Sequence, residues 1–194
     1  MMLIGLTGGI GMGKSVASKY LLSRGEPVID TDVLARELVA PGKPALGDIE
    51  QAFGHTVLLE DGSLDRSALA AIVFKSEANR RTLEGILHPR IRKAWVDWAA
   101  ELRKVGTPRA TVVIPLLFET GAEKQFDLTV CVACHPVTQR IRLAGRGWSN
   151  DQVNARIAAQ LPVREKMERS HRVVWNEYSL ENCHAQLHRI FAAI

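Results

Sequence analysis

Eight residues near the start of the chain have the types and spacing of a phosphate-binding loop. Residues 8–15 read GGIGMGKS and match G-x-x-x-x-G-K-[ST], with an apolar segment before them and a helical pattern after them. Glycines allow successive main-chain N–H groups to face one anion, and the helix start adds partial positive charge. Lys14 is expected to reach the β- and γ-phosphates of a nucleoside triphosphate, and Ser15 to hold Mg²⁺. A glycine-rich turn with a chance Gly-Lys-Ser is the weaker alternative.

Two carboxylates follow the next apolar segment, residues 27–30. Asp30 and Asp32 stand at the carboxyl end of this expected strand, the edge where open α/β sheets bind ligands. A kinase that acts on an alcohol needs a carboxylate to orient the hydroxyl and accept its proton. We expect Asp32 to have that role, and Asp30 is a candidate to anchor Mg²⁺ through water. Capping of the following helix is the alternative for either residue.

The third expected strand separates classes of nucleotide-binding protein. Motor ATPases and switch GTPases usually carry an aspartate near the tip of such a strand, where it anchors the metal. Here residues 114–119 read IPLLFE, and no N-K-x-D motif for guanine recognition occurs. The sequence therefore favours a small-molecule kinase.

Five short apolar segments alternate with helical patterns along the chain. Their runs are continuous rather than alternating, which indicates burial on both faces, as in a parallel sheet covered by helices. Helical spacing also places a last helix at residues 180–193, and SNDQ at 149–152 is a capping-box pattern that opens a helix through residue 160. We therefore predict an α/β fold. The expected strands are residues 3–7, 27–30, 110–114, 128–133 and 172–175, with a first helix at 14–24.

About eighty residues separate the second and third expected strands, too many for one crossover helix. Pro89 is expected in the first turn of a helix at 91–102, with His88 as its cap. A substrate-binding subdomain and additional helical packing explain this insertion equally well. Helical patterns within it cover residues 48–53, 69–74, 78–87 and 91–102.

The composition excludes several classes of protein. With 46% hydrophobic residues and a net charge of +4, the chain is expected to be globular rather than disordered. That charge suits anionic small molecules and nucleic acid alike, but no basic cluster or aromatic–basic alternation favours nucleic acid. No run approaches the ~18 apolar residues of a membrane span, and no signal peptide is predicted. We expect a cytoplasmic protein with no membrane or nucleic-acid partner, as a monomer or small homo-oligomer.

The three cysteines are too few and too scattered for a disulfide scaffold, which fits a reducing compartment. Cys131 and Cys134 lie three apart around an expected strand, so their thiols point to opposite faces. We therefore expect no metal or redox role for this pair.

Five sequence blocks, taken in order, resemble the dephospho-CoA kinase family. The phosphate-binding loop is shared with many kinases, whereas the combination of the DTD, HPRIR and PLLFE patterns is much more specific to one family. The resemblance covers nearly the whole chain. The blocks are GLTGGIGMGKS at 5–15, VIDTDVLAR at 28–36, LHPRIR at 87–92, VVIPLLFE at 112–119 and RIAAQ at 156–160.

The resemblance implies a single P-loop kinase domain with a five-stranded parallel sheet in the order 2-3-1-4-5. It implies a nucleotide-binding core at 1–32, 105–137 and 170–194, a helical CoA-binding insertion at 33–104 and a lid at 138–169. The implied reaction transfers the γ-phosphate of ATP, with Mg²⁺, to the ribose 3′-hydroxyl of dephospho-CoA, the last step of CoA synthesis.

The resemblance also implies roles for individual residues. Arg142 and Arg146 are expected on one helix face, where they close over the phosphates, with a solvated basic face as the alternative. The implied catalytic residues are Asp32, Lys14, Arg142 and Arg146. The implied ATP-binding residues are Gly9, Gly11, Met12, Gly13, Lys14, Ser15, Val16 and Asn176. The implied substrate-binding residues are Thr7, Asp32, Arg36, His88, Arg92, Leu116 and Glu119.

Two departures from the family pattern keep other interpretations open. After the second lid arginine the family usually has R-D-G, whereas here Gly147 and Trp148 follow Arg146, so this turn is one residue shorter. Near the last strand, Trp175 stands where the family favours aspartate. Asn176 remains a candidate for a contact with adenine or with the main chain. The alternatives are a nucleoside or nucleotide kinase of similar layout and a weakened ATP- or CoA-binding regulator.

Overall fold

The computed structural model describes residues 1–73 and 75–194, and the chain divides into two units. Unit 1, Met1–Asp30 and Leu102–Ile194, contains the sheet, whereas unit 2, Thr31–Glu101, is mainly helical. None of the helices in the described part of the chain combines the length and apolar character needed to cross a bilayer.

Within the described residues, unit 1 is built on five parallel strands in the order β2-β3-β1-β4-β5, as expected. Gly5, in the middle of β1, pairs with Val112 on one side and Thr129 on the other, so β1 is the central strand. Each strand agrees with its expected segment to within one residue at either end. The strands are β1 (Met2–Thr7), β2 (Val28–Asp30), β3 (Arg109–Val113), β4 (Leu128–Ala133) and β5 (Arg172–Trp175).

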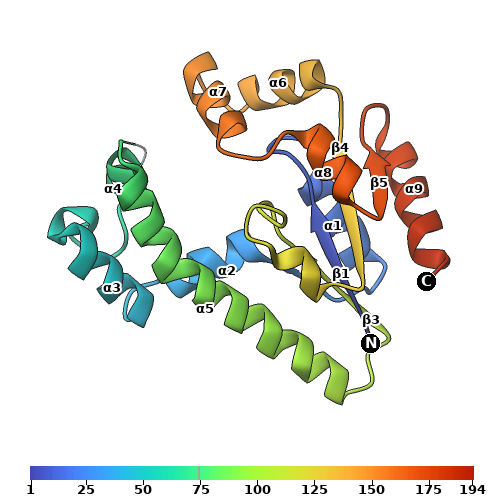
Figure 1. Cartoon of the computed structure of the whole chain (residues 1–194), viewed down its shortest axis with the longest axis horizontal. Coiled ribbons are helices and arrows are strands. Elements are labelled where there is room, and N and C mark those ends of the chain that lie inside the picture. The colour runs from blue at the N-terminus through green and yellow to red at the C-terminus, as the bar shows by residue number, and fades with distance from the viewer. Residues whose placement is uncertain (74) are drawn as a thin grey trace. The chain divides into compact units, whose positions relative to one another are not determined.

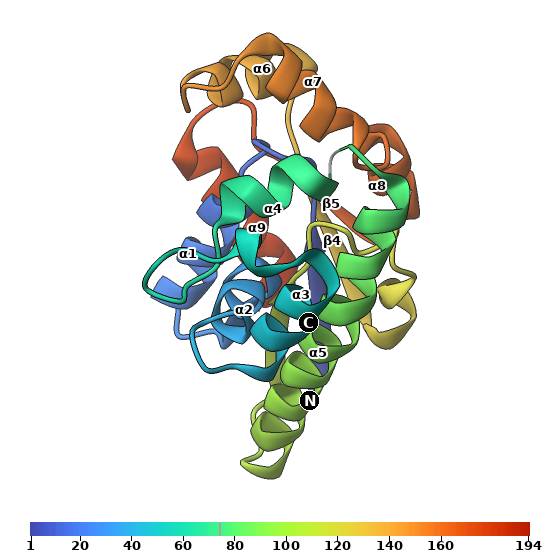
Figure 2. The ribbon, with the colours of Figure 1, turned by 90° about the vertical axis from the view of Figure 1, so that its left-hand side faces the viewer.

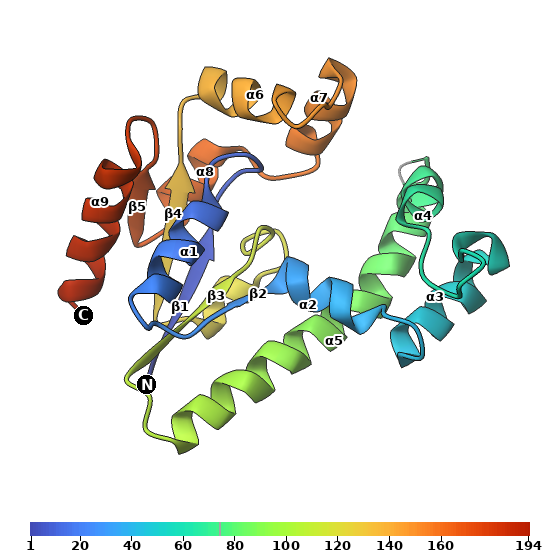
Figure 3. The same ribbon diagram turned by 180° about the vertical axis from the view of Figure 1, so that it is seen from behind.

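Helices cover both faces of this sheet (Figures 1 and 3). α1 (Lys14–Ser23) and α9 (Leu180–Ala192) lie side by side and pack on the face that includes Val130. α8 (Val163–Arg169) contacts β4 and packs on the face that includes Cys131. Because consecutive strand residues point to opposite faces, Val130 and Cys131 belong to different buried clusters. Burial on both faces is the reason that the strands are continuously apolar.

Two short helices follow β4, and a turn joins them. α6 (Pro136–Ala144) ends before the turn at residues 145–147, and α7 (Asn150–Ala158) begins with the expected capping box. The prediction that Arg142 and Arg146 share a helix face is wrong, because Arg146 lies beyond the end of α6. Gly147 adopts a positive φ of 77°, a conformation that ends a helix at low cost for glycine.

In unit 2, three of the four described helices contribute side chains to a small apolar cluster, among them Ile49, Leu69 and Ile86 (Figure 2). Two short 3₁₀ turns, His55–Val57 here and Ala122–Gln125 in unit 1, complete the described elements. Phe74, the last residue of the helix expected at 69–74, lies outside the described residues. The helices are α2 (Thr31–Leu38), α3 (Pro44–Phe53), α4 (Arg66–Val73) and α5 (Glu77–Lys104).

The two helices expected at 78–87 and 91–102 are one helix, α5, with Pro89 in its interior. The prediction that His88 caps a second helix is therefore wrong. Proline removes one main-chain hydrogen bond. Ile86 and Leu87 before it pack in the apolar cluster, and Trp95 and Ala99 after it are buried, so burial on both sides favours one continuous helix. The Arg90 guanidinium donates to the carbonyl oxygen of Ile86 over 2.7 Å and also pairs with Asp48 of α3, which ties this turn to its neighbour.

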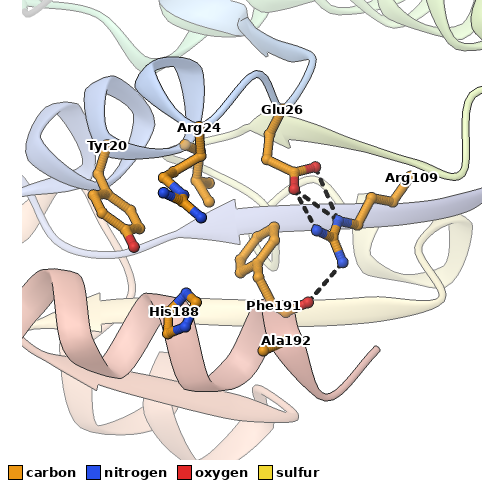
Figure 4. Close-up of a pocket in the computed structure, with 8 residues that line it drawn as sticks. Tyr20, Arg24, Glu26, Arg109, His188, Phe191 and Ala192 are labelled. Carbon is orange, nitrogen blue, oxygen red and sulfur yellow. Dashed lines mark hydrogen bonds and ion pairs between the residues drawn. The ribbon is translucent and has the colours of Figure 1, made fainter.

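A pocket of about 250 Å³ in unit 1 lies at the amino-terminal edge of the sheet (Figure 4). Arg109, the first residue of β3, pairs there with Glu26 and donates to the carbonyl oxygen of Phe191 over 2.6 Å. These contacts join the start of β3 to the α1–β2 connection and to α9. The phosphate-binding loop follows the opposite, carboxyl end of β1, so this pocket is separate from it.

Candidate active site

The phosphate-binding loop has a path that only glycine permits at two positions. Gly8 and Gly13 have φ values of 146° and 106°. A Cβ atom on Gly13 would lie 1.9 Å from Nδ2 of Asn176, and one on Gly8 would lie 2.1 Å from the carbonyl oxygen of Val132. The main chain therefore passes too close to β4 and to the segment after β5 for any side chain.

The main-chain amides of the loop fall into two groups. The Ile10 N–H donates to Oε1 of Gln160 over 2.9 Å, and the Met12 N–H donates to the Gly9 carbonyl oxygen over 3.2 Å. Within residues 1–73 and 75–194, the amides of Gly11, Gly13 and Ser15 donate to no protein acceptor. Such amides at a helix start are the donors that an anion satisfies.

Lys14 adds a positive charge beside these amides. Its Nζ donates to the carbonyl oxygens of Gly8 and Gly9 over 2.8 and 3.1 Å, so the ammonium lies within the curve of the loop. Ser15 is exposed one residue later, and Val16 is half-buried against the cluster beneath α1. The loop thus combines main-chain donors, a cation and a hydroxyl within a few consecutive residues.

The segment after β5 supports the loop. Asn176 is only 4% exposed, and its Nδ2 donates to the Met12 carbonyl oxygen over 3.0 Å. Of the two contacts considered for Asn176 from the sequence, the structure shows the one with the main chain. Trp175 is half-buried and packs in the cluster that contains Met12 and Cys131.

The two expected phosphate-binding arginines have different surroundings. Nη2 of Arg142 donates to the Asn176 carbonyl oxygen over 3.0 Å, and its Nη1 is buried without a hydrogen-bond partner among the described residues. Arg146 is exposed, and its guanidinium lies 5.8 Å from the centre of the Trp148 ring. Arg156 lies 4.2 Å from the same ring. The tryptophan that departs from the family pattern therefore contacts one of the two expected arginines.

Three residues expected to bind the acceptor belong to unit 1. Thr7 is fully buried, and its hydroxyl donates to the Pro115 carbonyl oxygen over 3.4 Å. Glu119 lies 2.7 Å from the Lys166 ammonium and accepts from the Leu161 N–H over 2.9 Å. Leu116, which lies between Pro115 and Glu119 in the chain, is half-buried.

The other expected acceptor residues belong to unit 2 and lie in two pairs, each one helical turn apart. Asp32 and Arg36 are exposed on α2, which begins directly after Asp30 ends β2. On α5, His88 is half-buried and Arg92 is exposed. Because residues four apart lie on the same side of a helix, the members of each pair are able to meet one ligand.

No group of three or more histidine, cysteine, aspartate or glutamate side chains suited to a metal ion occurs in the described residues. Mg²⁺ does not require such a group, since in kinases it binds through one or two protein oxygens, substrate phosphates and water. The Ser15 hydroxyl and the Asp30 carboxylate supply oxygen atoms of the kind that Mg²⁺ takes as ligands.

The sequence did not predict four side chains that make hydrogen bonds around the site: Gln139, Gln160, Lys166 and Glu177. Nε2 of Gln139 donates to the Ile10 carbonyl oxygen over 2.8 Å. Glu177 accepts the Thr138 hydroxyl and the His135 N–H at the start of α6, and these bonds lower its pKa. Gln160 was visible within the RIAAQ block, whereas Gln139, Lys166 and Glu177 lie in no motif.

The family model and the most similar sequences point to one family, and two solved structures share the fold. The family model described as dephospho-CoA kinase matches residues 2–182. A dephospho-CoA kinase of Anaeromyxobacter dehalogenans is 46% identical over 193 residues, covering 99% of this chain and 92% of that protein. The crystal structure of a Thermus thermophilus protein is similar with a TM-score of 0.83 at 35% identity, covering 100% and 97% of the two chains. The dephospho-CoA kinase of Campylobacter jejuni, at 23% identity, has the same fold with a TM-score of 0.71, covering 98% and 95%.

Proposed function

The chain belongs to the dephospho-CoA kinase family, and on that premise we propose that it transfers the γ-phosphate of ATP to the ribose 3′-hydroxyl of dephospho-CoA. The products are CoA and ADP, which makes this the last step of CoA synthesis. The observation that carries the proposal is the phosphate-binding loop, where the amides of Gly11, Gly13 and Ser15 have no acceptor among the described protein residues and Lys14 lies beside them.

ATP binds with its phosphates on these amides, and the start of α1 adds favourable charge. Lys14 exchanges the Gly8 and Gly9 carbonyl oxygens for β- and γ-phosphate oxygens, which accept a hydrogen bond from an ammonium more strongly. Ser15 and Asp30 are the residues that would hold Mg²⁺, Asp30 through water, and the ion would neutralise charge on the phosphates.

Asp32 is the proposed general base. Its carboxylate is exposed in the first turn of α2, immediately after the carboxyl end of β2. Asp32 takes the proton of the 3′-hydroxyl as that oxygen bonds to the γ-phosphorus, and the bond to the β–γ bridging oxygen breaks to release ADP. The other acceptor contacts in this proposal are Thr7, Arg36, His88, Arg92, Leu116 and Glu119.

Arg142 and Arg146 stabilise the phosphoryl group during transfer. The buried Nη1 of Arg142, which has no partner among the described residues, supports this role, because buried donors in proteins are normally hydrogen-bonded. The low energy of an exposed cation–π contact means that Arg146 can exchange Trp148 for a phosphate.

The same proposal divides the chain into a nucleotide-binding core at 1–32, 105–137 and 170–194, a CoA-binding insertion at 33–104 and a lid at 138–169. We further propose a cytoplasmic enzyme that acts as a monomer or small homo-oligomer.

Incubation with ATP, Mg²⁺ and dephospho-CoA tests the function directly. We expect ADP and CoA in equal amounts, and no product when a nucleoside or DNA replaces dephospho-CoA. Phosphorylation of nucleosides in preference to dephospho-CoA would instead support the alternative of a nucleoside kinase. Binding of both substrates without turnover would support the weakened regulator.

Asp32→Asn tests the base. We expect kcat to fall by about 10²–10⁴-fold, the usual contribution of a general base, while ATP binding measured by calorimetry is retained. Asp97→Asn is the matched control, because Asp97 is an exposed carboxylate on α5 that pairs with Lys93. Turnover of Asp32→Asn at the parent rate would show that the base is another residue.

A further inference from the structure

Two glutamine side chains hold opposite sides of one residue in the phosphate-binding loop. Gln139 of α6 donates from Nε2 to the Ile10 carbonyl oxygen over 2.8 Å, and Gln160 accepts the Ile10 N–H at Oε1 over 2.9 Å. Gln139 is only 6% exposed and Gln160 is half-buried. Both hydrogen bonds connect segments more than a hundred residues apart in the sequence.

The chemistry of the main chain fixes which atom each glutamine uses. A carbonyl oxygen only accepts and an N–H only donates, so Gln139 must present its NH₂ group and Gln160 its oxygen. The two side chains therefore differ in what can replace them. A glutamate is able to accept the Ile10 N–H at position 160, whereas a glutamate carboxylate at position 139 would face the carbonyl oxygen with no proton to donate.

The glutamines stand at the two ends of the segment that carries Arg142 and Arg146. α6 also packs directly on the loop, since a Cβ atom on Gly11 would lie 2.8 Å from Cδ2 of Leu143. The segment from 140 to 159 is thus attached to one loop residue at both its beginning and its end. That loop residue, Ile10, directly precedes Gly11, the first of the residues whose amides are expected to bind phosphate.

We propose that Gln139 and Gln160 are positioning residues that fix the arginine-bearing segment, residues 140–159, relative to the phosphate-binding loop. The proposal rests on the proposed function for its catalytic consequence. Neither glutamine touches the reacting atoms. Their effect comes from holding Arg142 and Arg146 where the transferring phosphoryl group is stabilised, a placement on which phosphoryl transfer depends strongly.

This role predicts a specific kinetic pattern. The groups that bind ATP before reaction, the loop amides and Lys14, remain when either glutamine is changed, so KM for ATP should change by less than about threefold. Loss of one hydrogen bond that leaves a main-chain group unsatisfied should lower kcat by about tenfold. A purely structural role would lower the melting temperature without separating kcat from KM.

The decisive comparison replaces each of the two glutamines, at positions 139 and 160, by glutamate. Gln139→Glu and Gln160→Glu each add one negative charge beside the loop, but only the second retains its hydrogen bond. We expect kcat of Gln139→Glu to be at least about tenfold below that of Gln160→Glu. Equal losses in the two variants would show that charge rather than the hydrogen bond matters, and would overturn the proposal.

Neutral variants and a second measurement guard against misfolding. Gln139→Met and Gln160→Met remove the hydrogen bonds without adding charge, and both should show the kcat loss at a nearly unchanged KM. Hydrogen exchange at the Ile10 amide should be faster in Gln160→Met than in the parent and in Gln160→Glu. An Ile10 amide that exchanges equally fast in all three would also overturn the proposal, independently of activity.

Asn154→Ala is the matched control. Asn154 of α7 accepts from the Arg140 guanidinium of α6 over 2.7 Å on the exposed side, so this variant loosens the helix pair without touching the loop. We expect its kcat to stay within about twofold of the parent, and a tenfold loss would contradict the assignment to the glutamines. A parent protein that makes no CoA would refute the proposed function, while the hydrogen-exchange comparison would still test the hydrogen bond of Gln160 to Ile10.

Discussion

The ammonium of Lys166 lies 2.7 Å from the carboxylate of Glu119, and no part of the lysine side chain is exposed to solvent. The same Nζ donates to the Pro115 carbonyl oxygen over 2.6 Å. Helix α8 is thereby attached to the segment that follows β3, which also contains Leu116. A buried ion pair of this kind adds little net stability, but removal of one partner leaves an uncompensated charge.

Lys166→Met and Glu119→Gln should each lower the free energy of unfolding by about 3–5 kcal/mol, because each leaves one charge without its partner. The double variant should lose less than the sum of the two, since neither charge then remains. Urea denaturation measures all three. Glu168→Gln, in an exposed pair with Arg164, is the control and should change stability by less than about 1 kcal/mol. Additive losses would refute the coupling.

Gly13→Ala should abolish ATP binding, because its Cβ atom would collide with Nδ2 of Asn176 as well as adopt a left-handed conformation. Gly25→Ala isolates the second effect. Gly25 has a φ of 77°, and nothing lies within 4 Å of the Cβ atom that alanine would add. This substitution should therefore cost only about 1–2 kcal/mol of stability and leave the affinity for ATP unchanged. Calorimetric titration with ATP separates the two. Normal affinity in Gly13→Ala would show that the loop tolerates a different path.

Lys14→Met should lower kcat by about 10²–10³-fold, the typical loss when one charge-stabilising donor is removed. Lys19→Met, an exposed lysine on the same helix, controls for the general loss of positive charge. Steady-state rates of ADP release measure both. A Lys14→Met rate close to that of Lys19→Met would exclude Lys14 from the mechanism.

Trp148→Ala should have a small effect. An exposed cation–π contact is worth about 0.5–1 kcal/mol, so releasing Arg146 from the ring should change kcat by less than about fivefold. Arg146→Met, assayed in parallel, should lose much more. If Trp148→Ala were as impaired as Arg146→Met, the indole would have a catalytic part that its contacts do not indicate.

The buried Cys131 thiol should make stability depend on pH in the alkaline range. Burial raises its pKa from 9.0 to about 11, and the charges of Lys166 and Lys14 offset this only in part. Between these values the unfolded chain releases the proton and the folded chain keeps it, so stability falls as the pH rises from 9 to about 11. The contribution is about 2 kcal/mol.

Denaturation under reducing conditions at a series of pH values measures this effect. In Cys131→Ala the fall between pH 9 and 11 should be shallower than in the parent, whatever the variant's stability at neutral pH. Parallel curves for the two proteins would show that other groups account for the alkaline slope.

Local signals were sufficient for the phosphate-binding loop and the sheet. Gly8, Gly13 and Lys14 act within a few consecutive residues, so their spacing alone predicted the loop. The strands were predicted because burial on both faces leaves a continuous apolar run that no other element of that length requires. Local signals failed at Pro89. They predicted a helix start there, because they do not include the free energy gained when a long helix packs, which exceeds the cost of one lost hydrogen bond.

The amino-acid sequence by itself determined the loop, the parallel sheet and the kind of chemistry that the loop supports. Only the tertiary structure decided that Gln139 and Gln160 meet at Ile10, that Asn176 holds Met12, and that Lys166 is buried against Glu119. These contacts connect residues 129, 150, 164 and 47 positions apart. Periodicity reports which side of an element is buried, but it carries no information about which distant polar group completes a hydrogen bond there.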